Sequence, residues 1–259
     1  MGSGASKKAG ARPQTARRTS ELGSVLSSAG ITKVILIRHA NAQPRDLEAA
    51  AVEAGAVIKP GTPFANSWTV GDLIRPLTSK GEEQAAAAAT AYLDAMALRA
   101  VVCSEATRAI RTGEIMTHGR FAKGAPGYLT LHTLHPSRSG TPDCEKMFDQ
   151  LGYGTLNTFF ADTSVPGCEG RGREIFRGYV VKVTGELHGL LATGLGAGLG
   201  AGDTVAVFGH AVFLNAVAIA VGEAMSIDKA EELVAAMELG EAQGILCDSA
   251  AKTIELKKY

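Results

Sequence analysis

Short apolar runs recur along the chain, and helix-forming stretches separate them. The first run, residues 31–37, is rich in β-branched side chains, which is typical of a strand covered on both faces of a parallel sheet. Similar runs follow at 99–103, 128–134 and 203–208. The alternation of strand and helix predicts an α/β fold with three layers, in which helices flank a mostly parallel central sheet.

The helices of this fold are predicted where strong helix formers accumulate. The clearest case is the stretch 82–98, which contains five consecutive alanines at 85–89. Two late strands, at 244–247 and 253–256, are expected to pair as a hairpin at an edge of the sheet. Further helices are expected at 105–119, 144–151, 156–160 and 171–193, and from 211 to about 225.

Two segments interrupt the alternation. Residues 46–70 combine an alanine-rich piece with Pro60, Gly61 and Pro63, and we expect a short helix followed by a long loop that acts as a lid beside a site. Residues 194–202 are mostly glycine and alanine and lack the Lys-Ser/Thr ending of a phosphate-binding P-loop. We interpret this second segment as a linker.

The N-terminal residues 1–30 are rich in Gly, Ala, Ser and basic side chains and show no hydrophobic period. We expect them to form a disordered basic arm ahead of one globular domain at 31–259. The first eight residues, with Gly2 after the initiator and Ser6 before two lysines, match the N-myristoylation pattern. A lipid on Gly2 together with the basic arm would hold the protein on an anionic membrane surface. A solvated tail or the remnant of an expression tag is the alternative interpretation.

Composition limits the classes of function. The formal net charge is zero, so the overall charge gives no reason to expect nucleic acid as a partner. The four cysteines show no CxxC spacing, which favours free thiols over a zinc site. No apolar run reaches the ~20 residues of a membrane span. We therefore expect a cytoplasmic protein, attached peripherally to membranes if Gly2 is lipidated.

Three polar segments stand where predicted strands end. Arg38 and His39 follow the first strand, Ser104 and Arg108 follow the second, and His210 follows the run 203–208. Ligands of open α/β sheets bind outside the carboxyl ends of the strands, so these side chains are expected to converge. Convergence would create one site with affinity for phosphate.

Four motifs resemble the histidine phosphatase superfamily, which includes phosphoglycerate mutases and bacterial phosphohistidine phosphatases. They are Arg38-His39-Ala40, the segment 75–78 with Gly81, the segment 104–112, and Gly209-His210-Ala211. The resemblance covers roughly residues 33–220 and implies a phosphoglycerate mutase-like fold. It also implies that His39 becomes phosphorylated during the reaction, with neither a metal nor a cofactor.

The chemistry of the side chains agrees with the roles that the resemblance implies. A neutral imidazole at His39 can attack phosphorus and form a phosphohistidine. Arg38 and Arg108 would hold the phosphoryl oxygens, because guanidinium groups offer planar donors that stay charged. His210 would donate a further hydrogen bond. Arg45 lies where mutase-like members often carry a phosphate-binding Asn, which makes it a further candidate.

A general acid is harder to identify. The stretch 131–136, where many members carry a catalytic Glu, contains no carboxylate, and the nearest acids are Asp143 and Glu145. Glu145 is the candidate general acid. Ala42 stands where a mutase would carry Ser or Thr. These two differences favour a phosphatase that resembles the phosphohistidine phosphatases more than the mutases.

We therefore expect a phosphomonoester or phosphoprotein phosphatase that acts on a phosphorylated small molecule or a phosphoprotein. The alternative is a family member with weak or no activity that serves as a binding or scaffold subunit of a larger assembly. The missing acid is the main support for that alternative.

Overall fold

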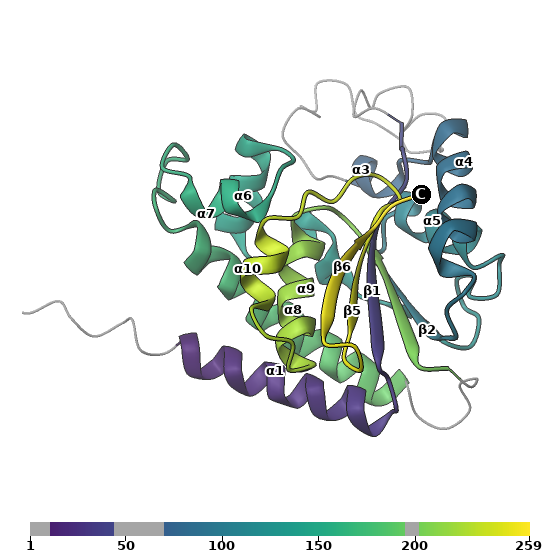
Figure 1. Ribbon diagram of the computed structural model, residues 1–259. Coiled ribbons are helices and arrows are strands. Elements are labelled where there is room, and N and C mark those ends of the chain that lie inside the picture. The colour runs from purple at the N-terminus through teal and green to yellow at the C-terminus, as the bar shows by residue number, and fades with distance from the viewer. Residues whose placement is uncertain (1–10, 44–69, 195–201) are drawn as a thin grey trace, which may run out of the picture.

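The computed structural model describes residues 11–43, 70–194 and 202–259. Their centre is a six-stranded sheet with the strand order β3-β2-β4-β1-β5-β6 (Figure 1). The strands are β1 (Lys33–Arg38), β2 (Leu98–Cys103), β3 (Tyr128–Thr130), β4 (Thr204–Gly209), β5 (Gly244–Asp248) and β6 (Thr253–Lys257).

Parallel pairing joins β3, β2, β4 and β1, whereas β5 and β6 run antiparallel to their neighbours. The sheet is therefore mostly parallel, as predicted, and the two last strands form the expected hairpin at one edge. β1 and β4 occupy the middle, which explains why their sequences are apolar at successive positions.

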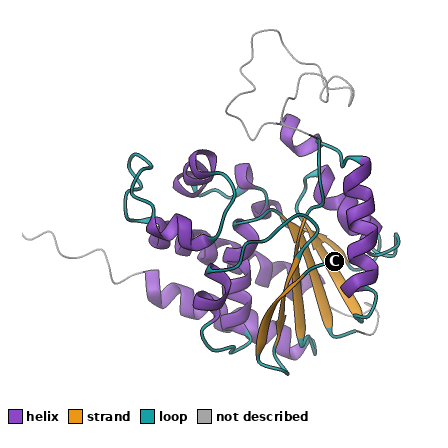
Figure 2. Ribbon diagram, turned by 45° about the horizontal axis from the view of Figure 1, so that its top comes forward, coloured by secondary structure: helices purple, strands orange, loops and turns teal. Residues whose placement is uncertain are grey.

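Helices cover both faces of the sheet, so the predicted three layers are confirmed (Figure 2). Alternate side chains of β1 enter two different cores: Val34 and Leu36 contribute to the larger one, and Ile35 and Ile37 to the smaller one. The larger core includes buried residues of α6 (Pro142–Leu151), α7 (Leu156–Ala161), α8 (Gly172–Gly194), α9 (Phe213–Ala224) and α10 (Ala230–Ala235). The smaller one includes those of α4 (Ser79–Ala88), the π-helical turn η2 (Ala89–Leu93) and α5 (Thr107–Met116).

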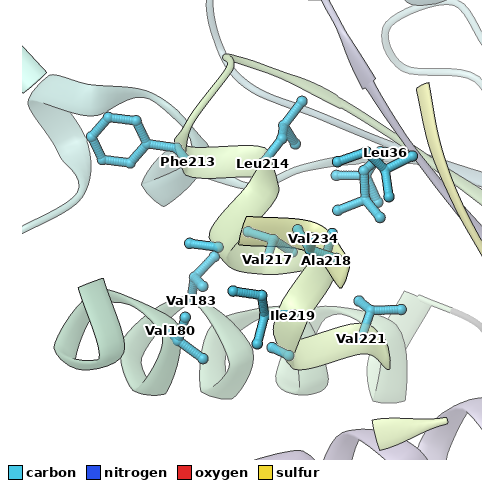
Figure 3. Packing of buried hydrophobic residues seen from close by; sticks show 14 of the residues in the cluster. Leu36, Val180, Val183, Phe213, Leu214, Val217, Ala218, Ile219, Val221 and Val234 are labelled. Atoms are coloured by element: carbon cyan, nitrogen blue, oxygen red, sulfur yellow. The ribbon is translucent and has the colours of Figure 1, made fainter. Parts of the chain in front are cut away.

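Helix α9 is the most thoroughly buried helix between the sheet and the outer layer. Its side chains fill the space between Leu36 of β1 and two valines of α8, Val180 and Val183 (Figure 3). This packing explains why α9 is apolar around its whole circumference: it contacts strands on one side and helices on the other.

The expectation of a disordered arm is wrong for residues 11–28, which form helix α1 (Ala11–Ser28). One face of α1 is buried at Thr15, Thr19, Leu22 and Leu26, a spacing of three to four residues that is typical of an amphipathic helix. The helix packs against α8 and α9. Threonine supplies part of the buried face in place of aliphatic residues, so the apolar period is weak in the sequence.

Several predicted elements have different boundaries. The strand expected at 128–134 ends at Thr130, and two short 3₁₀ turns follow, η3 (His132–Leu134) and η4 (Pro136–Arg138). The strand ends at Thr130 because β2, the only strand beside β3 in the described part of the chain, ends at Cys103, which is paired with Thr130. The short helix α3 (Val70–Ile74) and α10 had not been predicted. The proposed lid at 46–70, except Val70 at the start of α3, and most of the linker at 194–202 lie outside the described residues.

No helix in the described part of the chain combines the length and the apolar character needed to cross a bilayer. All four cysteines are buried free thiols, as the sequence predicted. Burial raises the pKa of the thiols of Cys103, Cys144 and Cys247, so these thiols stay protonated at neutral pH.

Candidate active site

The predicted site residues meet at the carboxyl edge of the sheet. His39 and Ser104 each extend a strand by one residue, because the His39 N–H donates to the Gly209 carbonyl (2.9 Å) and the Ser104 N–H to the Phe208 carbonyl (2.8 Å). His210 follows directly after β4. Helix α5 closes the group: Thr112 accepts a hydrogen bond from the Ala40 N–H (3.1 Å), and Arg108 lies one turn earlier. Parallel pairing of β1, β2 and β4 therefore brings together segments that are far apart in the sequence.

His39 is buried and held in one tautomer. Its Nδ1 lies 2.7 Å from the Ala40 carbonyl oxygen, and because a carbonyl can only accept, Nδ1 must carry the proton. Burial and the neighbouring charge of Arg108 place the pKa of His39 well below its usual value. The ring is therefore neutral at pH 7, and Nε2 carries the lone pair that a nucleophile needs.

His210 is also buried and neutral. Its ring centroid lies 5.1 Å from that of His39. Arg108 Nη2 lies 3.2 Å from Nδ1, which must accept because a guanidinium only donates, and Nε2–H is left to donate to the Ser104 hydroxyl at 3.0 Å. Burial and the charge of Arg108 hold the pKa of His210 well below its usual value.

Arg108 is among the most buried side chains of the protein, with 2% of its surface exposed. Nη2 donates to Asp72 Oδ2 at 2.8 Å, and Nη1 donates to the Asp72 carbonyl. Nε is buried and has no hydrogen-bond partner among the described residues. Buried donors without a partner are rare, so this N–H indicates a place for an acceptor from a ligand.

Arg38 lies beside His39 and is partly buried. Nη1 donates to the Leu239 carbonyl (3.0 Å), and the guanidinium lies 4.3 Å from the ring centroid of Tyr153, a cation–π contact. Its Nε, like that of Arg108 and that of Arg99 on β2, is buried without a partner in the described part of the chain. Two guanidinium groups thus keep one donor free close to the predicted nucleophile.

A buried carboxylate joins this group, which sequence reasoning had missed. Asp72 accepts hydrogen bonds from Arg75 Nη1 (2.8 Å) and His135 Nε2 (2.9 Å), in addition to that from Arg108. Burial raises the pKa of Asp72, but the hydrogen bonds from His135 and Arg75 and the charge of Arg108 outweigh it and hold the pKa well below the usual range. Asp72 is therefore ionised at neutral pH.

His135 completes the cluster. Its side chain is fully buried between η3 and η4, and its ring centroid lies 5.0 Å from that of His210. Burial lowers the pKa of His135, although the hydrogen bond to Asp72 opposes the shift. The sequence contained one signal for this cluster: Asp72 and Arg75 are three residues apart, the spacing of an ion pair on one helical turn.

The charges of the cluster do not balance. Arg38, Arg75 and Arg108 contribute three positive charges, Asp72 contributes one negative charge, and the three buried histidines are neutral. The site therefore favours a ligand with two negative charges, such as a phosphate group. Among the described residues, no group of three or more His, Cys, Asp or Glu side chains is arranged to hold a metal ion.

The remaining candidates do not join the cluster. Glu145 lies on α6 and accepts a hydrogen bond from Ser139 Oγ at 2.5 Å; no described contact connects it to His39. Arg45 and Gly2 lie outside the described residues. The structure thus brings together His39, His210, Arg38 and Arg108 from the predicted set, and adds Asp72 and His135.

Comparisons with known proteins agree with the predicted resemblance. The family model of the histidine phosphatase superfamily (branch 1) matches residues 66–123, a segment that contains Asp72, Arg75 and Arg108. No curated protein matches the chain.

Solved structures with a similar fold include alpha-ribazole phosphatase from Shigella flexneri, which is 16% identical over 87% of this chain and 94% of that chain, with a TM-score of 0.44. Phosphoglycerate mutase from Bacillus anthracis is 12% identical over 90% and 95%, with a TM-score of 0.42. The protein histidine phosphatase SixA, in complex with tungstate, is 12% identical over 87% and 94%, with a TM-score of 0.38.

Proposed function

We propose that this protein is a phosphatase that works through a phosphohistidine at His39. The observation that carries the proposal is the state of the His39 ring: Nδ1–H is bound to the Ala40 carbonyl, so Nε2 is a free nucleophile. The unpartnered Nε–H groups of Arg38 and Arg108 support it, because they can donate to phosphoryl oxygens.

The reaction follows from this geometry in two displacements. His39 Nε2 attacks phosphorus, and the bond from phosphorus to the leaving group breaks as the nitrogen–phosphorus bond forms. The leaving group keeps the electron pair and takes up a proton. Water then attacks the phosphohistidine, the nitrogen–phosphorus bond breaks, and phosphate leaves with His39 restored. Arg38 and Arg108 hold the charge of the phosphoryl oxygens in both steps.

The supply of the proton limits the class of substrate. Asp72 is ionised at neutral pH, and no contact among the described residues connects a carboxyl group to His39. We therefore propose a substrate whose leaving group needs little protonation, such as a phosphohistidine protein or an activated phosphomonoester. The alternative of an inactive scaffold subunit rests on the same missing carboxyl group and has no further observation in its favour.

Membrane attachment through a myristoylated Gly2 stays a proposal that rests on the sequence of residues 2–8. Two of the basic side chains expected to assist, Arg17 and Arg18, form ion pairs with Glu21 on α1, at 2.9 Å each. This pairing reduces their attraction to anionic lipid. A cytoplasmic location is likewise a proposal that rests on the sequence alone.

The function is tested by giving the purified protein p-nitrophenyl phosphate and a phosphohistidine peptide. We expect turnover, and we expect His39→Ala to lower kcat by about 10³-fold or more, because removal of a nucleophile abolishes the covalent route. Rapid quenching with labelled substrate should trap an acid-labile phosphohistidine in the wild type only.

The matched control is His118→Asn, since His118 is an exposed histidine paired with Asp94 and its positive φ of 51° suits asparagine. This variant should keep full activity. Wild-type inactivity on both substrates, or unchanged activity in His39→Ala, would refute the proposal.

A further inference from the structure

Asp72 is the point where three segments of the chain meet. The carboxylate receives hydrogen bonds from Arg75, directly after α3, from Arg108 on α5, and from His135 between η3 and η4. Asp72 is 2% exposed. Oδ1 accepts from Arg75, whereas Oδ2 accepts from both Arg108 and His135, so both oxygens already have donors.

The way Asp72 contacts Arg108 decides which donors remain. The Asp72 carbonyl and Oδ2 occupy Nη1 and Nη2, which form the end of the guanidinium plane. Nη2 also contacts His210 Nδ1. These contacts use three of the five guanidinium protons. The two left over are the second proton of Nη1 and Nε–H, and Nε is the nitrogen that is buried with no partner at all among the described residues. Asp72 therefore fixes the orientation of Arg108 and leaves one edge for an anion.

By orienting Arg108, Asp72 also affects His210. Because Arg108 donates to Nδ1 of His210, Nε2 must carry the ring proton, and this proton points to Ser104. A rotation of Arg108 would remove the donor that selects this tautomer. The orientation of Arg108 and the tautomer of His210 thus depend on the carboxylate of Asp72. No described contact joins this carboxylate to His39 or to the place of the phosphoryl group.

A buried ion pair is by itself weak evidence for a role in stability, because the desolvation of two charges offsets their attraction. The arrangement here is more specific than stability requires: three donors from three elements fix both oxygens. Two other roles for Asp72 have less support. Ionised Asp72 cannot act as a general acid, and an internal competitor of phosphate would need to occupy the Nε edge, which is free.

We propose that Asp72 is a positioning residue, which holds the Arg108 guanidinium in the orientation that presents Nε–H to a phosphoryl group and thereby fixes the tautomer of His210. The inference rests on the proposed function, since it names what prepares that same site. Arg75 and His135 act through Asp72 by holding its two oxygens.

The test is Asp72→Asn, which keeps the size of the side chain and removes its charge. We expect the affinity for tungstate, measured by titration calorimetry on the folded protein, to fall about tenfold, the loss typical of weakening one charge-assisted hydrogen bond. KM for p-nitrophenyl phosphate should rise by a similar factor, while a phosphohistidine still forms at His39. Asp72→Glu should recover part of the lost affinity, because it retains the charge but displaces it by one methylene.

The matched control is Glu82→Gln, which breaks the exposed ion pair with Arg111 on the same helix as Arg108. It should leave tungstate affinity unchanged. A merely structural role for Asp72 predicts a lower urea midpoint with unchanged affinity of the folded variant, and that result overturns the inference. Higher activity in Asp72→Asn overturns it too, since Asp72 would then compete with phosphate. If Asp72→Asn does not fold, the tungstate affinity of Asp72→Glu tests the inference instead. An affinity equal to that of the wild type would overturn it.

Failure of this inference is distinguishable from failure of the proposed function. If the wild type turns over substrate and binds tungstate, and Asp72→Asn binds it equally well, only the positioning role is wrong. If the wild type neither binds tungstate nor turns over p-nitrophenyl phosphate, the proposed function fails first.

Discussion

Three buried histidines define the chemistry of the site at the scale of single residues. His39, His135 and His210 are each buried, and burial is the main reason that the pKa of each lies below the usual histidine value. A neutral His39 is required for attack on phosphorus, so this environment supports nucleophilic catalysis at pH 7 and somewhat below.

The same shifts make the stability of the protein depend on pH. Between the lowered pKa values and the unfolded value of about 6.5, the unfolded chain binds more protons than the folded one. The free energy of unfolding should therefore fall as the pH falls from 7.5 to 5.5, by up to about 1.4 kcal/mol per pH unit for each histidine. Urea titrations across this range measure the slope.

His135→Gln tests whether the buried histidines cause this dependence of the unfolding free energy on pH. His135→Gln removes one of the three titrating groups and should make the slope shallower by about one proton. Asp72 does not interfere, because a carboxyl with a lowered pKa contributes its full stabilisation above its unfolded pKa of about 3.9 and loses it only at lower pH. Equal stability at pH 7.5 and 5.5 would show that the buried histidines are protonated in the folded protein.

At the scale of elements, the start of α4 is joined to the loop that carries His39. Thr78 caps the helix by accepting from the Gly81 N–H at 3.0 Å, and its hydroxyl donates to Asn41 Oδ1 at 2.7 Å. A Cβ added to Gly81 would lie 2.0 Å from the Asn41 carbonyl oxygen, which is a backbone atom. This close approach requires glycine at position 81.

We therefore expect Gly81→Ala to separate α4 from the His39 loop. The change should lower the free energy of unfolding by about 1–3 kcal/mol, the usual cost of overpacking, and should lower kcat/KM because His39 is displaced. Urea unfolding and assays with p-nitrophenyl phosphate measure both effects. Gly178→Ala on α8 is the control: no atom lies within 4 Å of the added Cβ. It should be neutral or stabilise the protein by up to about 1 kcal/mol. Equal behaviour of the two variants would contradict the assigned contact.

At the scale of the whole molecule, α1 belongs to the folded body and lies away from the site. Figure 1 shows α1 beside the amino end of β1, whereas α3 and the start of α4 lie on the side of its carboxyl end. Leu22 and Leu26 of α1 are part of the larger core, and an added Cβ on Gly23 would lie 2.5 Å from the Ala224 carbonyl oxygen of α9.

The truncation Leu22→Ala should therefore destabilise the protein by about 2–5 kcal/mol, as expected for a leucine removed from a packed core. Activity per folded molecule should not change, because the described contacts of α1 are with α8 and α9 and none of them reaches a residue of the site. Ser24→Ala, at an exposed position of the same helix, is the control and should be close to neutral. Thermal and urea unfolding distinguish the two. An unaffected Leu22→Ala variant would indicate that α1 contributes nothing to the core.

Local sequence was sufficient for the order and type of most elements. The β-branched run of β1 and the alanine-rich α4 have strong local preferences, and His39 and His210 could be assigned to one edge because parallel strands end together. Asp72 could not be assigned in the same way, because α3 is short and its meaning depends on Arg108 and His135, which are distant in sequence.

The sequence by itself therefore determined the α/β class, the strands β1 and β4, and the candidates His39, His210, Arg38 and Arg108. Only the tertiary structure decided that residues 11–28 form a docked helix and that Asp72 joins the site. The physical reason is the same in both cases. The threonine-containing face of α1 and the charge of Asp72 are stable only against partners that folding brings from elsewhere in the chain, and no local pattern specifies those partners.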